Sequence, residues 1–164
     1  MDVPAHFHFR YRRLVEFADT DLAGIMHFAN FFRFVECAEH AFFRSLGFRV
    51  HTHDDAGHHG WPRIEASCKF HKPARFEQTL DVCLRLDEIR TTSLSYSFWI
   101  FPAEEPERPL LASGAFTIIH VAIDSNPRGI RKAPIPAALR AKLEAAMGTT
   151  IDLHGRGGAS DRKA

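Results

Sequence analysis

One segment limits the fold of this chain more than any other, an apolar helix rich in phenylalanine. From residue 28 to residue 46 apolar side chains recur at helical spacing, and others widen the apolar stripe well beyond one face. The recurring positions are Phe28, Phe31, Phe32, Val35, Ala38, Phe42 and Leu46, and the widening ones are Phe34, Ala41 and Phe43. Such a helix is stable only when other elements surround it, so we expect a central helix that is ended by Gly47.

Strand-like runs are available to surround this helix. Residues 7–17 alternate between apolar and basic side chains. After a loop at 50–60 come four further runs, at residues 64–71, 80–89, 93–101 and 110–123. The short connections between these runs, at 90–92 and 102–109, favour antiparallel neighbours. Strands grouped after one helix predict an α+β fold, with a five-stranded antiparallel sheet around the helix.

The length of the chain fits one domain. With 45% hydrophobic residues, 164 residues can bury a core without disulfides or metal. Residues 134–147, alanine-rich with a proline at the start, are typical of a short helix. Residues 149–164 are rich in glycine and polar side chains. We expect a single domain over residues 1–148 and a disordered tail over residues 149–164.

Composition excludes several classes of protein. The formal net charge of +1 lacks the basic excess of a nucleic-acid-binding protein. The three cysteines are odd in number and widely spaced, which favours reduced thiols over a disulfide framework. No run is long enough to cross a membrane, and residues 1–10 are charged where a signal peptide is apolar. We expect a cytoplasmic protein that binds a small molecule.

Two aspartates, in Asp19-Thr20-Asp21, lie between the first expected strand and the apolar helix. At the start of a helix the backbone N–H groups lack intrahelical acceptors and the helix dipole is positive. Such groups stabilise the oxyanion that forms when a carbonyl is attacked, and an ionised aspartate can act as nucleophile or general base. On residue types alone, a helix-capping turn is the commoner explanation.

The sequence around these aspartates resembles the signature of the 4-hydroxybenzoyl-CoA thioesterase family. Residues 17–31, FADTDLAGIMHFANF, contain its Asp-x-Asp, a glycine three residues later, aliphatic residues, a histidine–aromatic pair, a small residue, Asn and an aromatic residue. Residues 69–82 resemble the family's strand, Pro-Ala bend and following strand, and residues 131–136 resemble its C-terminal end. The likeness extends over about residues 12–136 in the right order.

The resemblance implies the hotdog fold, hydrolysis of an acyl-CoA thioester, and Asp21 as the catalytic carboxylate. It also implies a structural role for Asp19 and an oxyanion donor at the backbone N–H of Phe28. The CoA thiol, with a pKa of about 8.5 like that of cysteine, leaves as a thiolate without a general acid. Whether Asp21 forms an acyl anhydride or activates water stays open.

Two further residues are secondary candidates for catalysis. Bacterial family members have histidine immediately before the small residue, where this chain has Phe28, and its own histidine is one position earlier, at His27. A polar contact at the start of the helix is the commoner role for such a histidine. Glu36 lies in the middle of the helix, where related enzymes can use an acid, but a solvated glutamate is the commoner case.

Substrate contacts are expected from the same resemblance. It places Gly60 and Trp61 at the border of the acyl pocket and Arg90 against the nucleotide of CoA. A second basic cluster can hold phosphate, although ordinary surface charge also explains it: Arg128, Arg131 and Lys132. The phenylalanines near the start of the helix favour an aromatic or short- to medium-chain acyl group.

Neither a metal nor a cofactor is expected, since CoA is part of the substrate. The loop at 51–60 concentrates imidazole and carboxylate groups, but it lacks the rigid i, i+4 helical pair of many metal sites. Cys37 and Cys68 are interpreted as buried apolar residues, because nothing near them in the sequence lowers a thiol pKa.

The resemblance further implies a homodimer or homotetramer with active sites at subunit interfaces. Two alternative functions stay open. One is hydrolysis of acyl groups carried by acyl carrier protein. The other is a non-catalytic hotdog module that binds acyl-CoA or protein, in which Asp21 only caps the helix.

Overall fold

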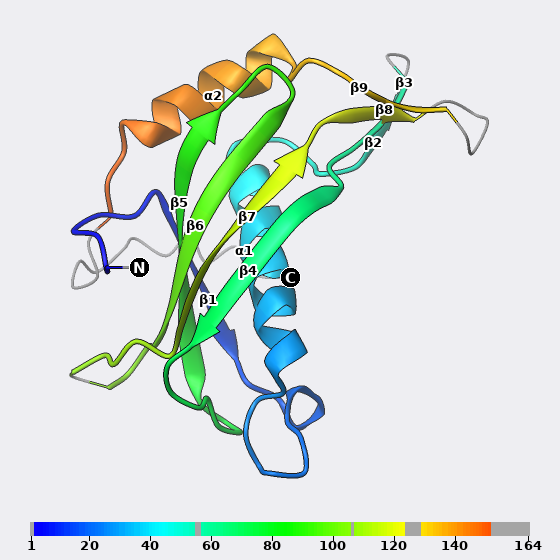
Figure 1. Cartoon of the computed structure of the whole chain (residues 1–164). Coiled ribbons are helices and arrows are strands. Elements are labelled where there is room, and N and C mark those ends of the chain that lie inside the picture. The colour runs from blue at the N-terminus through cyan, green and yellow to red at the C-terminus, as the bar shows by residue number, and fades with distance from the viewer. Residues whose placement is uncertain (1, 55–56, 106, 124–128, 152–164) are drawn as a thin grey trace.

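The computed structural model describes residues 2–54, 57–105, 107–123 and 129–151 (Figure 1). Within these ranges the chain forms strands β1 (Phe9–Leu14), β2 (Thr52–Asp54), β3 (Gly57–Gly60), β4 (Arg63–Phe70), β5 (Thr79–Ile89), β6 (Ser93–Pro102), β7 (Ala112–Ile119), β8 (Val121–Ile123) and β9 (Ile130–Lys132). The helices are the 3-10 turn η1 (Phe17–Asp19), α1 (Phe28–Ser45) and α2 (Ala137–Met147).

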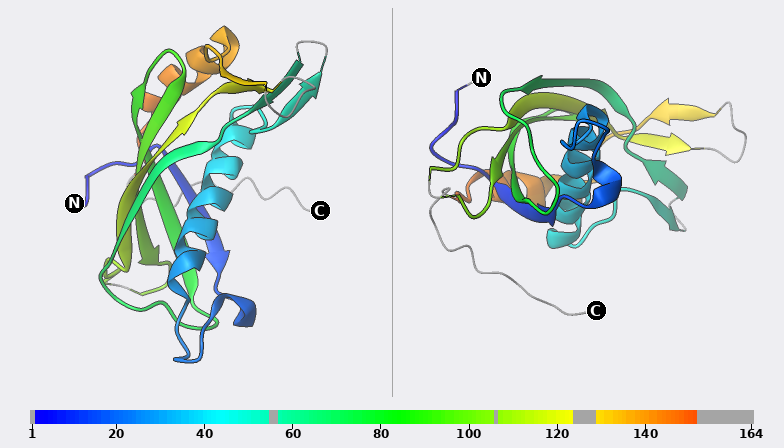
Figure 2. Two further views of the ribbon diagram at one scale, coloured as in Figure 1. Left: turned by 45° about the vertical axis from the view of Figure 1, so that its right-hand side comes forward. Right: turned by 90° about the horizontal axis from the view of Figure 1, so that it is seen from below.

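Five of the strands form one antiparallel sheet in the order β1-β5-β6-β7-β4. Its longest ladder joins β5 to β6, from Leu80 opposite Pro102 to Ile89 opposite Leu94. The sheet curves around α1, which lies against its concave face (Figures 1 and 2). The α+β fold predicted from the sequence, a five-stranded antiparallel sheet around a central helix, is confirmed.

Helix α1 forms where the phenylalanine spacing predicts it. Its buried side chains are Phe31, Phe34, Val35, Ala38, Glu39, Phe42 and Phe43. The helix ends at Gly47, which has a φ of 85°, a conformation that glycine adopts without strain. The N–H of Gly47 donates to the Arg44 carbonyl and that of Phe48 to the Phe43 carbonyl, both at 3.0 Å. This pair of bonds is a Schellman motif, which satisfies the last carbonyls of the helix.

The buried faces of α1 and the sheet make up the main core. The sheet contributes alternate residues of its two central strands, as one face of a pleated strand requires. These are Leu80, Val82, Leu84 and Leu86 from β5 and Leu94, Tyr96, Phe98 and Ile100 from β6. Each fully buried large apolar side chain contributes about 1.5–3 kcal/mol. The contact between helix and sheet is therefore the main source of stability.

A buried ion pair joins α1 to β4. Glu39 is 2% exposed, and its carboxylate accepts a hydrogen bond from the Arg63 guanidinium. That guanidinium also lies over the Phe116 ring, 4.6 Å from its centroid. Burial raises the pKa of Glu39 to about 7, because the loss of hydration outweighs the attraction of Arg63. The pair holds β4 against the helix, whereas the sheet itself holds β4 only through β7.

Three details differ from the sequence-based expectation. The loop expected at 50–60 contains β2 and β3, which join β8 and β9 in a second, four-stranded sheet. The strand expected at 110–123 is broken at His120, whose N–H donates to the Thr92 carbonyl at 2.7 Å. The first strand ends at Leu14. The histidine-rich β2 and β3 lack apolar alternation, so their pairing with each other and with β8 is not visible in the sequence.

Helix α2 lies beside β5 at the end of the sheet far from the start of α1 (Figure 1), and its buried side chains are Leu139 and Leu143. Most of the tail expected over residues 149–164 falls outside the described residues, from 152 onwards. Its first three residues are described. Ile151 exchanges two backbone hydrogen bonds with Phe7, at 2.9 and 2.8 Å, so the chain is paired up to that point.

Gly114 on β7 leaves no room for a side chain. A Cβ at this position would lie 2.0 Å from the Ser67 carbonyl oxygen on β4 and 2.6 Å from the Phe98 ring. We predict that Gly114→Ala lowers the free energy of unfolding by at least about 1–3 kcal/mol, because β4 and β7 must move apart. Urea unfolding followed by circular dichroism measures the change.

Gly148→Ala is the matched control, because the nearest atom to a Cβ there is the Ala145 carbonyl oxygen at 3.4 Å and the backbone φ is −80°. Its free energy of unfolding is expected to stay unchanged or rise slightly. An equal loss in both variants would contradict the steric explanation.

Candidate active site

The turn that follows η1 fixes the position of Asp21. The Asp21 carbonyl accepts from the Gly24 N–H at 3.0 Å, and the Asp21 N–H donates to the Ile25 carbonyl at 2.9 Å. The carboxylate Oδ1 accepts from the Ala23 N–H at 2.8 Å, as aspartate side chains do in tight turns. Gly24 has a φ of 70°, which disfavours any residue with a Cβ. The glycine three residues after the second aspartate is therefore needed by the turn that presents the carboxylate.

Asp19 holds this turn against the helix. It is 2% exposed, and its Oδ2 accepts from the Glu16 N–H at 3.1 Å. Its carbonyl accepts from the His27 N–H and from the Asn30 side-chain amide, both at 2.9 Å. Two cations stand near its carboxylate, Arg13 and Arg33. These contacts give Asp19 a structural role.

Helix α1 begins directly beyond this network. His27 is its N-cap: Nδ1 accepts from the Ala29 N–H at 3.3 Å, and the His27 carbonyl accepts from the Asn30 N–H at 2.9 Å. Phe28 is the first helical residue, so its N–H has no intrahelical acceptor. No hydrogen-bond partner for it is present among the described residues. This N–H, at the positive end of the helix, can bind an oxyanion.

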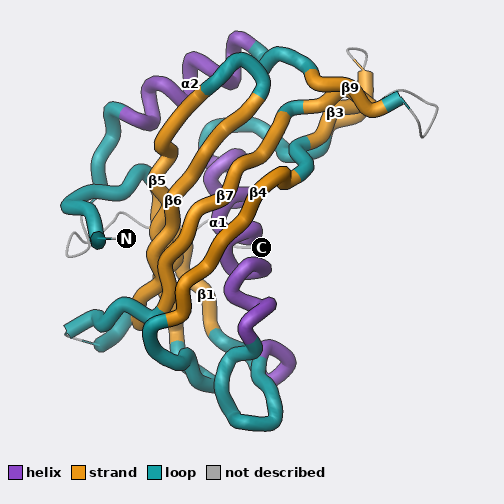
Figure 3. The backbone as a smooth tube through the Cα atoms, viewed as in Figure 1, coloured by secondary structure: helices purple, strands orange, loops and turns teal. Residues whose placement is uncertain are grey.

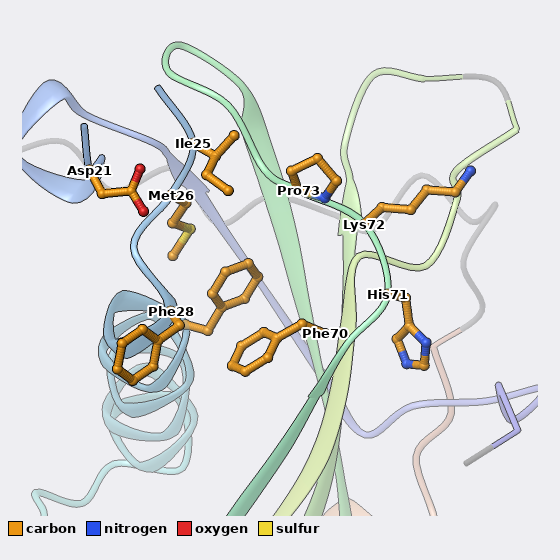
Figure 4. A pocket seen from close by; sticks show the side chains of 9 residues that line it. Asp21, Ile25, Met26, Phe28, Phe70, His71, Lys72 and Pro73 are labelled. Atoms are coloured by element: carbon orange, nitrogen blue, oxygen red, sulfur yellow. The ribbon is translucent and has the colours of Figure 1, made fainter. Parts of the chain in front are cut away.

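Asp21 and Phe28 line one cavity of about 410 Å³. Most of its lining residues belong to the loops, teal in Figure 3, at the end of the sheet where α1 begins. Figure 4 shows Asp21 and Phe28 on one side and Phe70, at the end of β4, on the other. The other apolar wall residues are Ile25, Met26, Phe31 and Pro73. A carboxylate and a helix N-terminus thus share one recess with apolar walls, which is open to solvent at Phe28.

Polar residues stand at the rim of this cavity. His71 and Lys72 follow β4 and are exposed. The Nε2 atom of His71 lies 2.9 Å from the Ser113 hydroxyl, and the Lys72 side chain extends away from Asp21 (Figure 4). Lys72 thus brings a positive charge to the rim, which favours the approach of an anionic substrate.

The two secondary candidates lie outside the cavity wall. His27 uses Nδ1 for the helix cap, and its ring centroid is 4.5 Å from that of Phe28. Glu36 is exposed on α1, about two turns beyond Phe28. A part in catalysis for either residue stays a prediction.

Gly60 and Trp61 lie at the other end of α1. Trp61 packs edge to face on Phe43, with ring centroids 5.3 Å apart. Phe43 is 15 residues beyond Phe28 in the helix, a rise of roughly 22 Å. Within one chain these two residues are therefore remote from Asp21.

Of the predicted phosphate contacts, Arg90, Arg131 and Lys132 are also remote from Asp21 within one chain. Arg90 lies in the turn between β5 and β6 and pairs with Glu88 at 2.9 Å. Arg131 and Lys132 are exposed on β9. Arg128 lies outside the described residues. A role in CoA binding stays a prediction for all four arginine and lysine residues.

The described residues contain neither a reactive thiol nor a group of three metal ligands. Burial raises the pKa of Cys68 to about 11 and that of Cys83 to about 12, which disfavours the reactive thiolate. All three cysteines, including Cys37, are unbridged. Across residues 2–54, 57–105, 107–123 and 129–151 no three His, Cys, Asp or Glu side chains are grouped to hold an ion. In those same ranges no helix is both long and apolar enough to cross a membrane.

Sequence reasoning alone does not identify Ile25, Met26 or residues 70–73 as cavity residues. The signal is present in residues 69–82, whose Pro-Ala bend resembles that of the family. The structure shows what this bend does, because the Ala74 carbonyl accepts from the Met26 N–H at 2.8 Å. That long-range bond brings the end of β4 beside the Asp21 turn.

A five-stranded antiparallel sheet wrapped around one helix is the hotdog fold that the family resemblance implies, and it defines the class of hotdog-fold proteins. Residues 15–143 match the family model of the thioesterase-like superfamily, and the chain belongs to that superfamily. It is a thioester hydrolase, as the sequence predicts.

Named relatives are similar over most of the chain. A 1,4-dihydroxy-2-naphthoyl-CoA hydrolase of Thermosynechococcus vestitus is 29% identical over 136 residues, which are 83% of this chain and 88% of the relative. The solved 1,4-dihydroxy-2-naphthoyl-CoA thioesterase of Synechocystis has a TM-score of 0.71 and 26% identity, covering 85% of this chain and 95% of its own. A gentisyl-coenzyme A thioesterase structure has a TM-score of 0.66 and 25% identity, covering 80% and 98%. The hotdog fold is thereby confirmed.

Proline at position 28 tests the oxyanion donor. Proline lacks the N–H but suits the first helical position. The preceding residue, His27, already has φ −60° and ψ 136°, the region that a residue before proline prefers. We predict that Phe28→Pro lowers kcat about 100- to 1,000-fold with unchanged helix content. Thiol release from acyl-CoA substrates measures kcat, and circular dichroism measures helix content.

Phe28→Ala is the matched control, since it removes the ring and keeps the N–H. It is expected to change KM more than kcat. If the proline variant loses no more kcat than the alanine variant, the Phe28 N–H is not the donor.

Proposed function

We propose that the protein hydrolyses the thioester bond of an acyl-CoA, with the Asp21 carboxylate as the group that attacks or activates water. One observation supports this most: Asp21 and the start of α1, where the Phe28 N–H has no partner among the described residues, line the same apolar cavity. A carboxylate and an oxyanion donor that converge on one carbonyl are what this reaction requires.

Three features support coenzyme A as the carrier and an aromatic group as the acyl part. The relatives named above act, by their names, on CoA thioesters of naphthoyl and gentisyl groups, which are aromatic. The cavity offers the rings of Phe28, Phe31 and Phe70, which suit a flat apolar ring. The positive charge of Lys72 at the rim suits the phosphates of CoA.

Two routes connect this geometry to the products. In one, an Asp21 oxygen bonds to the thioester carbon, the C–S bond breaks, CoA leaves as a thiolate, and water hydrolyses the acyl anhydride. In the other, Asp21 takes a proton from a water molecule whose oxygen bonds to the same carbon, and the C–S bond breaks in the same way. Both routes need an ionised Asp21 and the Phe28 N–H, and neither needs a cofactor.

Asp21→Asn separates catalysis from helix capping. The amide has the size of the carboxylate and can still accept from the Ala23 N–H, but it is neither nucleophile nor base. We predict that kcat falls by about 100- to 10,000-fold while the melting temperature stays near that of the wild type. Thiol release from a panel of aryl- and alkyl-CoA esters measures kcat and ranks the acyl groups.

Asp2→Asn is the control, because it makes the same chemical change at an exposed residue outside the cavity. Its turnover is expected to equal that of the wild type. Wild-type turnover by a folded Asp21→Asn variant would sink the proposed function.

We also propose that two copies associate through β4. This strand lies at the edge of the five-stranded sheet and is bonded to β7 alone. Two large apolar side chains on it are open to solvent, Ile64 at 62% and Phe70 at 48% exposure. An unpaired edge of eight residues with exposed apolar side chains tends to pair with another strand.

The sequence of β4 is complementary to itself. Antiparallel pairing about a two-fold axis at Ser67 places Ile64 opposite Phe70 and Glu65 opposite Lys69, each of them twice. The same symmetry directs Trp61 of the partner subunit toward residues 70–73 in the cavity wall. The partner subunit then brings to the cavity the two residues that are remote from Asp21 within one chain. This supports the predicted place of Gly60 and Trp61 at the acyl pocket.

Charge reversal tests this register. Glu65→Lys alone, or Lys69→Glu alone, places like charges opposite each other, and opposite-charge cross-strand pairs contribute roughly 0.2–1 kcal/mol each. We predict a several-fold higher dimer Kd for each single variant and a return toward the wild-type value in the double variant. Analytical ultracentrifugation measures Kd. A double variant no tighter than the singles would contradict the pairing of Glu65 with Lys69.

A further inference from the structure

The second sheet carries a group of imidazoles that the proposed reaction does not use. β2 and β3 pair with His53 directly opposite His58, so these two side chains share a face. His51 immediately precedes β2, and its ring contacts that of His58. His59 points the other way and stacks on His120, with ring centroids 5.1 Å apart. Three histidines from both arms of the hairpin are thus brought together.

These three rings are in contact. The ring centroids of His51 and His58 are 4.5 Å apart, and those of His53 and His58 are 5.0 Å apart. The Nε2 atoms of His51 and His58 are separated by 2.6 Å. At that distance one ring must donate an N–H to the lone pair of the other. The Nε2 atoms of His51 and His58 therefore point toward each other.

We propose that His51 and His58 bind a first-row transition-metal ion, such as Zn²⁺, through their Nε2 atoms. Two nitrogens on a tetrahedral zinc ion lie roughly 3.3 Å apart, given Zn–N bonds of about 2.0–2.1 Å. The observed separation has to widen by less than 1 Å, which small side-chain rotations supply because His51 is exposed and His58 half-buried. The ion replaces the shared proton, which moves to Nδ1 of the donor ring. Water completes the coordination shell.

Imidazole ligands select zinc, nickel and copper over calcium and magnesium. The sequence predicts no metal here, because it contains no i, i+4 helical pair. In the structure the sheet holds the two histidines in place instead of a helix, since β3 is bonded to both β2 and β8. The site lies in the small sheet near the C-terminal end of α1, whereas Asp21 lies near the N-terminal end (Figure 1). The ion therefore takes no part in the hydrolysis, and its role is to join His51, just before β2, to His58 on β3.

Zinc titration of the full chain without a polyhistidine tag tests the proposal. Isothermal calorimetry is expected to give one Zn²⁺ per chain for the wild type. His51→Ala and His58→Ala are each expected to weaken binding at least about tenfold. Zinc should raise the melting temperature of the wild type and not that of these variants. Bound Co²⁺ should show a visible spectrum that both variants lose.

His6→Ala is the matched control, since His6 is exposed and lies outside this group. It is expected to bind zinc like the wild type. Melting temperatures without metal confirm that each variant folds. A wild-type chain that does not bind zinc at millimolar concentration, or unchanged affinity in either His51→Ala or His58→Ala, would overturn the two-histidine site. The test measures zinc binding and melting temperature, not thioesterase activity. Its outcome is therefore independent of the proposed reaction.

Discussion

Burial of α1 against the curved sheet is the interaction on which the rest of the structure depends. The helix brings Phe31, Phe34, Phe42 and Phe43 to the concave face, where they meet inward side chains of β5 and β6. Each such side chain contributes about 1.5–3 kcal/mol when buried, so together they outweigh any single polar contact. They also fix where the helix begins and ends. Its N-terminus is thereby held at one end of the sheet, beside the loops that carry the polar groups.

At that end, backbone hydrogen bonds hold the Asp21 turn and the segment after β4 against the start of the helix. Asp19 is buried and its carbonyl binds both the His27 N–H and the Asn30 side chain, so the Asp21 turn cannot move independently of the helix. The bond from Met26 to Ala74 adds the connection that follows β4. Three segments far apart in the sequence then enclose one cavity. In the proposed reaction, preorganisation of this kind means that the Phe28 N–H and the Asp21 carboxylate need no rearrangement when charge develops.

The two ends of α1 have different surroundings. The N-terminal end holds the cavity, whereas the C-terminal end packs on Trp61 and lies near the small sheet with its histidines. Between them runs β4, an edge strand that is tied to the helix through the ion pair of Glu39 and Arg63. An antiparallel partner on this edge would set the C-terminal end of one chain beside the cavity of the other. The same short strand thus shapes both the cavity and the proposed contact between copies.

The sequence by itself determined the central helix, the five main strands and the turn around Asp21. These depend on local properties: the spacing of phenylalanines, the alternation within strands, and a glycine that adopts a φ of 70° after an Asp-x-Asp. The same locality explains why residues 17–31, together with the weaker likeness of residues 69–82 and 131–136, indicated the class of enzyme.

Only the tertiary structure decided the rest. β2 and β3 consist largely of polar residues and histidine, so no apolar pattern marks them. They form a sheet because the chain separates from β6 where β7 ends, and after His120 continues as β8, which pairs with β3. The walls supplied by residues 70–73 depend on a hydrogen bond between Met26 and Ala74, about fifty residues apart. The contact between His51 and His58 likewise depends on the pairing of β2 with β3. Contacts across such distances in the chain follow from how whole elements pack, and a residue's immediate neighbours do not encode them.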